Sequence, residues 1–112
     1  MKKIEAVIKP DMFSSVKLAL AKAGHTSLTA YDVKGRGKQS GVIETVDGKS
    51  IRADILRKTK IEIVVEDEKV KEIINIIIKT ACTDTIGDGK IFVSPVEDAI
   101  RIRTSERGTK AI

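Results

Sequence analysis

Residues 61–93 carry the clearest fold signal in the chain and read IEIVVEDEKVKEIINIIIKTACTDTIGDGKIFV. The β-branched run at residues 61–65 predicts a strand, and Asp67 can cap a helix that follows it. The apolar side chains of that helix recur at helical spacing and form a stripe of Val70, Ile73, Ile74, Ile77 and Ala81, widened by Ile76 and Ile78. After the turn signal Asp88-Gly89, residues 90–93 predict another strand. This half of the chain therefore reads strand, helix, strand.

The preceding part of the chain repeats this order. Residues 3–9 alternate between apolar and polar side chains and predict a strand, which Pro10 ends. Asp11 can cap a helix that runs to Gly24, and residues 28–33 alternate again as a second strand. The two halves predict an α+β chain with the split βαβ pattern of ferredoxin-like folds.

Such a fold leaves one face of its sheet without helices. Two helices packed on the same side of a four-stranded sheet leave Val7 and Val64 on the bare side. Self-association is the simplest way to cover these side chains, so we expect an oligomer.

The long insertion between the two halves holds the charge of the protein. Residues 34–60 contain eight basic and three acidic residues, an excess that equals the whole net charge of +5. This concentration of charge favours an anion or an acidic surface as the target, although a merely solubilising loop gives the same pattern. The turn signal Asp47-Gly48 leaves two interpretations of residues 42–56, a β-hairpin or a long mobile loop.

Three features suit the binding of an anion. Residues 35–41 read GRGKQSG, and their glycines let backbone N–H groups approach a phosphate. Residues 86–90, IGDGK, form a second turn of this kind. Arg101 and Arg103 lie two apart on a predicted short fifth strand, so both project to one face. Each has a plain alternative, a simple turn or an exposed strand face, but together they favour a nucleotide site.

Composition excludes several classes of protein. At 112 residues the chain is expected to be one domain over residues 1–112, and no apolar run is long enough to span a membrane. Cys82 is the only cysteine, so no intrachain disulfide forms and a reducing cytoplasm is expected. Aromatic residues make up 3%, which disfavours a nucleic-acid binder. No nucleophile stands with a base in the sequence, so we expect binding and not catalysis.

Six segments together resemble the PII signal-transduction family, the small trimeric nitrogen regulators. The segments are MKKIEA at residues 1–6, KP at 9–10, VKGRGKQ at 33–39, KTKIEIVV at 58–65, IGDGKIFV at 86–93 and IRIRT at 100–104. The resemblance covers essentially the whole chain.

The resemblance implies a homotrimer whose sheets line the centre, with ATP or ADP bound in clefts between subunits. The residues that match the family's nucleotide site are Thr29, Gly35, Gly37, Lys38, Glu62, Val64, Gly87, Asp88, Gly89, Lys90, Arg101 and Arg103. It also implies a 2-oxoglutarate site made of Gln39, Lys58 and the backbone of residues 37–41, Gly41 included. There Mg²⁺ bridges the ATP phosphates, Gln39 and the ligand.

The implied function is a sensor of ATP, ADP and 2-oxoglutarate that is not an enzyme. Through a mobile loop at about residues 37–55 it would control an ammonium transporter or a nitrogen-assimilation enzyme. The alternative is a dedicated regulatory or inhibitory subunit of nitrogenase, or of another enzyme, with weak ligand control. Neither function requires nucleic acid or insertion into a membrane.

The expected loop departs from the family pattern. Ile51 stands where proteobacterial members carry a uridylylated tyrosine. Lys49, beside Ser50, stands where cyanobacterial members carry a phosphorylated serine, and Asp47 replaces the arginine that plugs ammonium channels. Lys38 replaces an arginine at the phosphates. Of these departures, Asp47 puts blocking of an ammonium channel in doubt.

Overall fold

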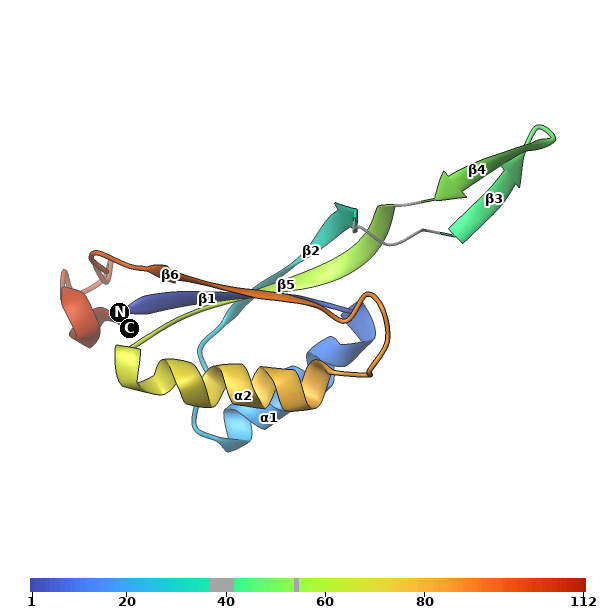
Figure 1. The fold of residues 1–112 in the computed structure, drawn as a ribbon. Helices are drawn as coiled ribbons and strands as arrows, with labels where there is room; N and C mark the ends of the chain where they lie inside the picture. Colours follow the sequence, from blue (N-terminus) through green and yellow to red (C-terminus); the bar gives the residue numbers. More distant parts are fainter. Residues whose placement is uncertain (37–41, 54) are drawn as a thin grey trace.

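The computed structural model describes residues 1–36, 42–53 and 55–112, drawn in Figure 1. The strands within these ranges are β1 (Lys2–Ile8), β2 (Thr29–Arg36), β3 (Val42–Val46), β4 (Lys49–Ala53), β5 (Ile55–Val65) and β6 (Gly89–Pro95). The helices are α1 (Phe13–Lys22) and α2 (Val70–Ala81), and the 3₁₀ turns are η1 (Pro10–Met12), η2 (Asp67–Lys69) and η3 (Gly108–Ala111). None of the helices in the described ranges is long and apolar enough to cross a membrane.

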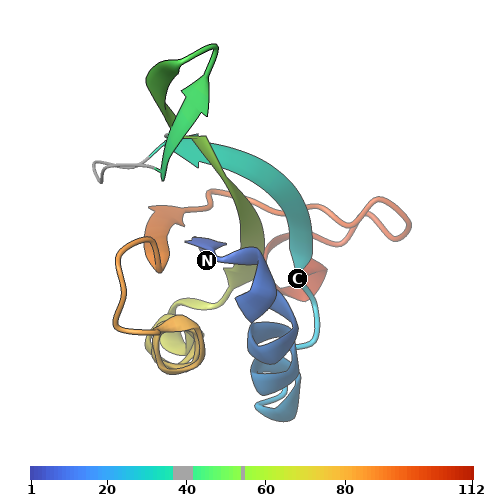
Figure 2. The ribbon, with the colours of Figure 1, turned by 90° about the vertical axis from the view of Figure 1, so that its right-hand side faces the viewer.

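The main sheet has the strand order β2-β5-β1-β6, with antiparallel pairing between neighbours. Strands β1 and β5 lie at the centre, and each βαβ half contributes one central and one edge strand. Figure 2 shows both helices on the same side of this sheet. This arrangement confirms the predicted α+β, ferredoxin-like fold.

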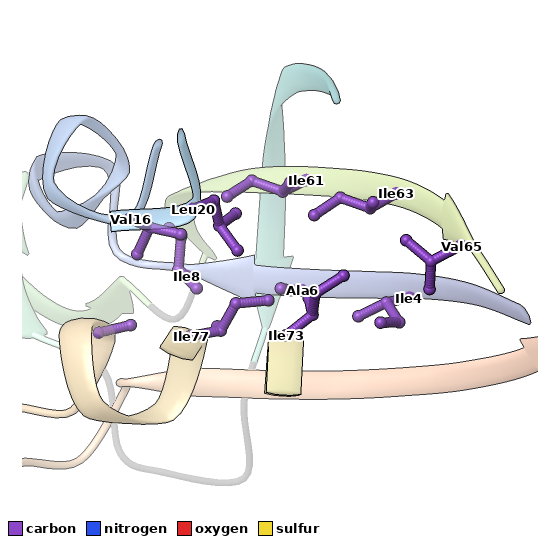
Figure 3. Close-up of a cluster of buried hydrophobic side chains, with 11 residues drawn as sticks. Ile4, Ala6, Ile8, Val16, Leu20, Ile61, Ile63, Val65, Ile73 and Ile77 are labelled. Atoms are coloured by element: carbon purple, nitrogen blue, oxygen red, sulfur yellow. The ribbon is translucent and has the colours of Figure 1, made fainter. Parts of the chain in front are cut away.

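The core lies between the sheet and the two helices (Figure 3). Alternate residues of β1 and β5 point into it, as the period of two in a strand requires. From α2, Ile73, Ile77 and Ala81 are buried, as the predicted stripe requires, whereas Ile78 is 52% exposed. Isoleucine is a modest helix former, so the packing of this stripe stabilises α2 more than intrinsic propensity does.

The other face of the sheet is free of both helices, and we call it the open face (Figure 1). It carries the side chains of β1 and β5 that alternate with the core residues, among them Glu5, Val7, Lys60 and Val64, all half-buried. Phe92 of β6 pairs in register with Glu5 and is 55% exposed. The bare sheet face predicted from the sequence is therefore present in the chain.

Strands β3 and β4 form a separate two-stranded hairpin that projects away from the main sheet (Figure 1). Asp47 and Gly48 join them, with φ angles of 50° and 73°. Two consecutive positive φ values are typical of the type I′ turn, whose twist matches that of the strands it connects. Of the two interpretations of this segment, the β-hairpin is therefore correct.

Two predicted helix caps are wrong. Asp11 and Asp67 lie inside η1 and η2, which lead into the helices, and neither makes a side-chain capping hydrogen bond. The backbone instead closes each turn, since the Met12 N–H donates to the Lys9 carbonyl and the Lys69 N–H to the Glu66 carbonyl, both at 3.0 Å.

The predicted fifth strand is also wrong. Ile100 forms only an isolated bridge to Arg107, and the chain turns over residues 102–104. The Arg101 N–H donates to the Glu106 carbonyl at 2.9 Å, so the segment closes on itself. Arg101 and Arg103 therefore do not share the face of a strand.

Candidate functional site

Lys58 joins three parts of the chain at the base of the hairpin. Its Nζ donates a hydrogen bond to the Gly87 carbonyl, in the loop between α2 and β6. Its Cγ lies 3.7 Å from the position that a Cβ on Gly35 would take, near the end of β2. The expected site residues Gly35, Lys58 and Gly87 are therefore neighbours, although 29 positions separate Lys58 from Gly87.

Two glycines give the loop before β6 its shape. Gly87 and Gly89 have φ angles of 95° and 110°, which L side chains rarely adopt. A Cβ on Gly89 would lie 1.7 Å from the Val7 carbonyl oxygen, because β6 begins there against the end of β1. Only glycine fits at this position, so the backbone requires the second glycine of the IGDG sequence.

Asp88 organises the same loop. Its Oδ2 accepts the Thr83 N–H at 2.8 Å, its Oδ1 accepts the Thr83 hydroxyl, and its Oδ1 pairs with Lys9 Nζ at 3.2 Å. The hydroxyl and then the N–H of Thr83 hold the pKa of Asp88 well below its usual range, and Lys9 adds to this effect. The carboxylate therefore stays ionised at neutral pH.

Four more expected site residues lie on the open face. Thr29 pairs in register with Glu62, Val64 with Lys3, and Lys90 with Val7. Residues paired in this way share one face of a sheet. Thr29, Glu62, Val64 and Lys90 are therefore on the same face as Lys58.

Glu62 has a partner within the chain. The Tyr31 hydroxyl donates to Glu62 Oε1 at 2.7 Å, and Lys60 Nζ lies 5.8 Å from the centre of the Tyr31 ring. Glu5 joins the neighbouring charges, with ion pairs to Lys3 at 2.9 Å and to Lys60 at 3.0 Å. The open face is thus a mixed surface of paired charges, and the apolar ring of Phe92 stands beside them in register.

This environment gives a spectroscopic prediction. The hydrogen bond to Glu62 raises the pKa of Tyr31 above its ordinary value of 10.0, because loss of the phenol proton would place two negative charges together. Tyr31 is the only tyrosine and tryptophan is absent, so the near-UV phenolate absorbance reports this group alone. We expect Glu62→Gln to lower the titration midpoint and Glu68→Gln, in η2, to leave it unchanged. A midpoint insensitive to Glu62→Gln contradicts the assigned contact.

Arg101 and Arg103 lie away from the phosphate-like loop. Strand β6 pairs Gly89 with Ile8 at one end and Pro95 with Lys2 at the other, a span of about 20 Å at the rise of a strand. The segment that carries both arginines follows the far end (Figure 1). The Arg101 guanidinium pairs there with Glu106 at 3.3 Å. One chain therefore does not bring these arginines to Gly89.

The expected site thus divides into two groups along the sheet. We call Gly35, Lys58 and residues 87–90 the loop group, because they lie at the Ile8 end of β1. Val64, Arg101 and Arg103 lie toward or beyond the Lys2 end, and we call them the arginine group. Thr29 and Glu62 lie between these groups.

Several expected residues lie outside the described ranges. They are Gly37, Lys38, Gln39 and Gly41. Among the residues that the structure does describe, no cluster of three His, Cys, Asp or Glu side chains is placed to hold a metal ion. The assignment of Mg²⁺ to Gln39 therefore remains a prediction. The described cationic and glycine-rich elements, Lys58, Lys90 and residues 87–89, fit a phosphate group.

Sequence reasoning missed three residues that contact the loop or form part of it. Lys9, Thr83 and Thr85 were not among the expected site residues, yet all three contact one another or Asp88. The clustered hydroxyls at residues 83–85, directly before IGDG, are the signal that was available. Hydroxyls near an aspartate in a turn commonly close the backbone by side-chain hydrogen bonds.

Comparison with known proteins identifies the family. The family description "Nitrogen regulatory protein P-II" matches residues 1–106. The chain is 52% identical to the nitrogen regulatory protein P-II of Porphyra purpurea, over all of both chains. It is 50% identical to nitrogen regulatory protein P-II 2 of Methanothermobacter thermautotrophicus, over all of this chain and 97% of that protein, and 50% identical over both full lengths to the P-II protein of Cereibacter sphaeroides. The chain therefore belongs to the nitrogen regulatory protein P-II family, a family of nitrogen-regulatory signalling.

Proposed function

We propose that this protein senses ATP, ADP and 2-oxoglutarate and passes the signal to a target protein through its β3-β4 hairpin. The observation that carries the proposal is the convergence of Gly35, Lys58 and Gly87 beside Lys90. Positive side chains beside a glycine-shaped backbone favour a polyphosphate. This convergence lies where β5 continues toward the hairpin, so a ligand there contacts the base of the segment that would meet a target.

The division of the expected site supports an oligomer as the active form, and the family resemblance implies that this oligomer is a homotrimer. The arginine group is about one strand length from the loop group within the chain. A neighbouring copy that supplies Arg101 and Arg103 would complete the expected nucleotide site. The open face provides a surface on which that copy can pack. In this assembly the nucleotide lies between subunits, and its negative charge bridges cations from both.

The proposed 2-oxoglutarate site uses Lys58 and Gln39. The Lys58 ammonium donates to the Gly87 carbonyl, so a carboxylate bound to this ammonium would lie beside the nucleotide loop. Binding of one ligand would then change the affinity for the other by the same factor. The target is an ammonium transporter or an enzyme of nitrogen assimilation. We propose that the protein acts in the cytoplasm as a regulator without turnover of ATP.

Calorimetric titration of 2-oxoglutarate, with and without Mg-ATP, tests this function. We expect heat of binding only with Mg-ATP present, and unchanged ATP recovered afterwards. Lys58→Met is expected to weaken 2-oxoglutarate binding at least about tenfold, the loss typical of a charged hydrogen bond. Lys34→Met is the matched control, because Lys34 is next to Val33, the register partner of Lys58, but lies on the opposite face of β2.

The other outcomes separate the alternatives. Binding of ATP without any response to 2-oxoglutarate leaves an adenine-nucleotide sensor, or a subunit dedicated to nitrogenase or another enzyme. An absence of binding by either ligand overturns the proposed function. Release of phosphate from ATP overturns the proposal that the protein is only a regulator.

A further inference from the structure

Lys9 directs its ammonium group at a single loop. It follows β1, and its Nζ donates to the hydroxyls of Thr83 at 3.1 Å and Thr85 at 2.6 Å. The same Nζ lies 3.2 Å from Asp88 Oδ1. An ammonium has three protons to donate, and these three partners match that number. The Lys9 side chain is 28% exposed and that of Asp88 22%, so both are partly shielded from water.

Asp88 uses both of its carboxylate oxygens inside the same loop. Oδ2 accepts the N–H groups of Thr83 at 2.8 Å and Thr85 at 3.4 Å, while Oδ1 accepts the Thr83 hydroxyl and the Lys9 ammonium. These bonds close residues 83–88 into a ring. A carboxylate placed against a phosphate would repel it, so a role for Asp88 as a direct ligand is unfavourable.

We propose that Lys9, Thr83, Thr85 and Asp88 are positioning residues that fix the loop for the phosphates of the nucleotide. This inference rests on the proposed function. Lys9 neutralises Asp88, and the closed ring holds residues 87–90 in the conformation that Gly87 and Gly89 permit. Lys58 fixes the other side of the loop through the Gly87 carbonyl. Ordering the loop before the ligand arrives reduces the conformational entropy lost on binding.

The assignment changes the expected role of Asp88 from nucleotide contact to support of the loop. It also gives a role to Thr85, the last residue of the Thr83-Asp84-Thr85 sequence. The Thr85 hydroxyl accepts the shorter of the two Lys9 hydroxyl contacts. The Thr85 hydroxyl therefore takes part in the ring.

Asp88→Asn, with Asp84→Asn as its control, tests the proposal. Both substitutions remove one negative charge from the same loop, but the Asp84 carboxylate is 3.4 Å from Cys82 Sγ and has no described contact with Lys9. Affinities for adenosine, ADP and ATP are measured by ligand-observed NMR and calorimetry. We expect Asp88→Asn to weaken ADP and ATP about tenfold, as for loss of a charged hydrogen bond, with adenosine unchanged. Asp84→Asn is expected to bind all three ligands as the unaltered protein does.

Comparison of adenosine, ADP and ATP distinguishes loss of loop positioning from general loss of structure. A variant that is merely destabilised has a lower affinity for adenosine as well. A variant whose phosphate loop is displaced keeps its affinity for adenosine and loses only the additional affinity that the phosphates of ADP and ATP provide. Thr85→Val is expected to lose part of that gain and Thr85→Ser to restore it. Equal affinity of Asp88→Asn and the unaltered protein for ATP overturns the proposal, and so does an equal loss for adenosine and ATP.

Hydrogen exchange separates this proposal from the proposed function. If the unaltered protein binds no nucleotide, the proposed function fails, but the ring is still measurable in the free protein. Asp88→Asn must then speed amide exchange at residues 83–90 and leave α2 unchanged. Unchanged exchange at residues 83–90 overturns the ring itself.

Discussion

Alanine at position 89 is expected to lower the free energy of unfolding by about 4 kcal/mol, at the upper end for single substitutions. A Cβ there would lie 1.7 Å from the Val7 carbonyl oxygen and 2.8 Å from the carbonyl carbon. Both atoms belong to the backbone of β1, a central strand, so no side chain can move aside to make room. The φ angle of 110° adds strain for any residue with a Cβ.

Gly24→Ala is the matched control for this substitution. Gly24 has a similar φ of 91°, but a Cβ there meets no atom within 4 Å. Alanine at Gly24 therefore carries only the conformational penalty, about 1 kcal/mol. Urea denaturation at one fixed protomer concentration measures both, because assembly makes stability depend on concentration. Equal losses for the two variants contradict the close approach of β6 to β1.

Two complementary variants are expected to restore each other's nucleotide binding when they are mixed. Arg101→Ala/Arg103→Ala removes two cations of the arginine group, and Lys90→Ala removes one of the loop group. We expect the double variant to weaken ATP binding about a hundredfold or more, since two charged hydrogen bonds are lost. If each site joins the loop group of one copy to the arginine group of the next, random mixing in trimers makes about a quarter of the sites intact.

To test this, the two variants are refolded together, and the number of tight ATP sites is measured by calorimetry. Each variant refolded alone is the control, and neither should show tight sites. Recovery of tight sites only in the mixture places the two groups on different chains. An absence of recovery, with trimers of mixed composition confirmed by mass spectrometry, would falsify the shared site.

The fold was predictable because the hydrophobic periods are clear. The alternation at residues 3–9 and 61–65 and the stripe that includes Ile73 and Ile77 each place one side of an element in the core. Each pattern is visible within a short segment, because the spacing of its apolar residues shows which side of the strand or helix is buried. The Asp47-Gly48 pair identified a turn, but turn chemistry alone did not distinguish a hairpin from a loop.

The incorrect details have a common physical origin. Asp11 and Asp67 are suitable caps, but backbone carbonyls accept the N–H groups where the helices begin, Pro10 from Phe13 and Asp67 from Val70, by forming 3₁₀ turns. Residues 100–103 alternate as a strand does, yet β6 ends at Pro95 and the described sheet offers them no partner strand. Local sequence shows what a segment is able to form, and competing backbone partners decide what it does form.

The residue types of the candidate site were predictable from the sequence, but the contacts between those residues were not. The glycine-rich segments at residues 35–41 and 86–90 marked an anion site in the sequence, and the structure brings Gly35 and Gly87 to Lys58. The contact from Lys9 to Thr85 spans 76 positions, and no local pattern encodes it. The separation of Arg101 from Gly89 depends on the direction of β6, which becomes visible only when the strands are paired.

Strand β5 changes its number of neighbouring strands along its length. Over residues 59–62 it lies between β1 and β2, but over residues 55–58 it pairs only with β2, because β1 ends at Ile8 opposite Thr59. A two-stranded ribbon twists more readily than the middle of a four-stranded sheet, so stiffness falls at Lys58. A rotation of the ribbon about that point displaces the Asp47-Gly48 turn farther than any residue of the sheet, as the long arm in Figure 1 shows. In the proposed function, a ligand contact at the Lys58 ammonium would thereby cause a larger displacement at the end of the hairpin that a target would meet.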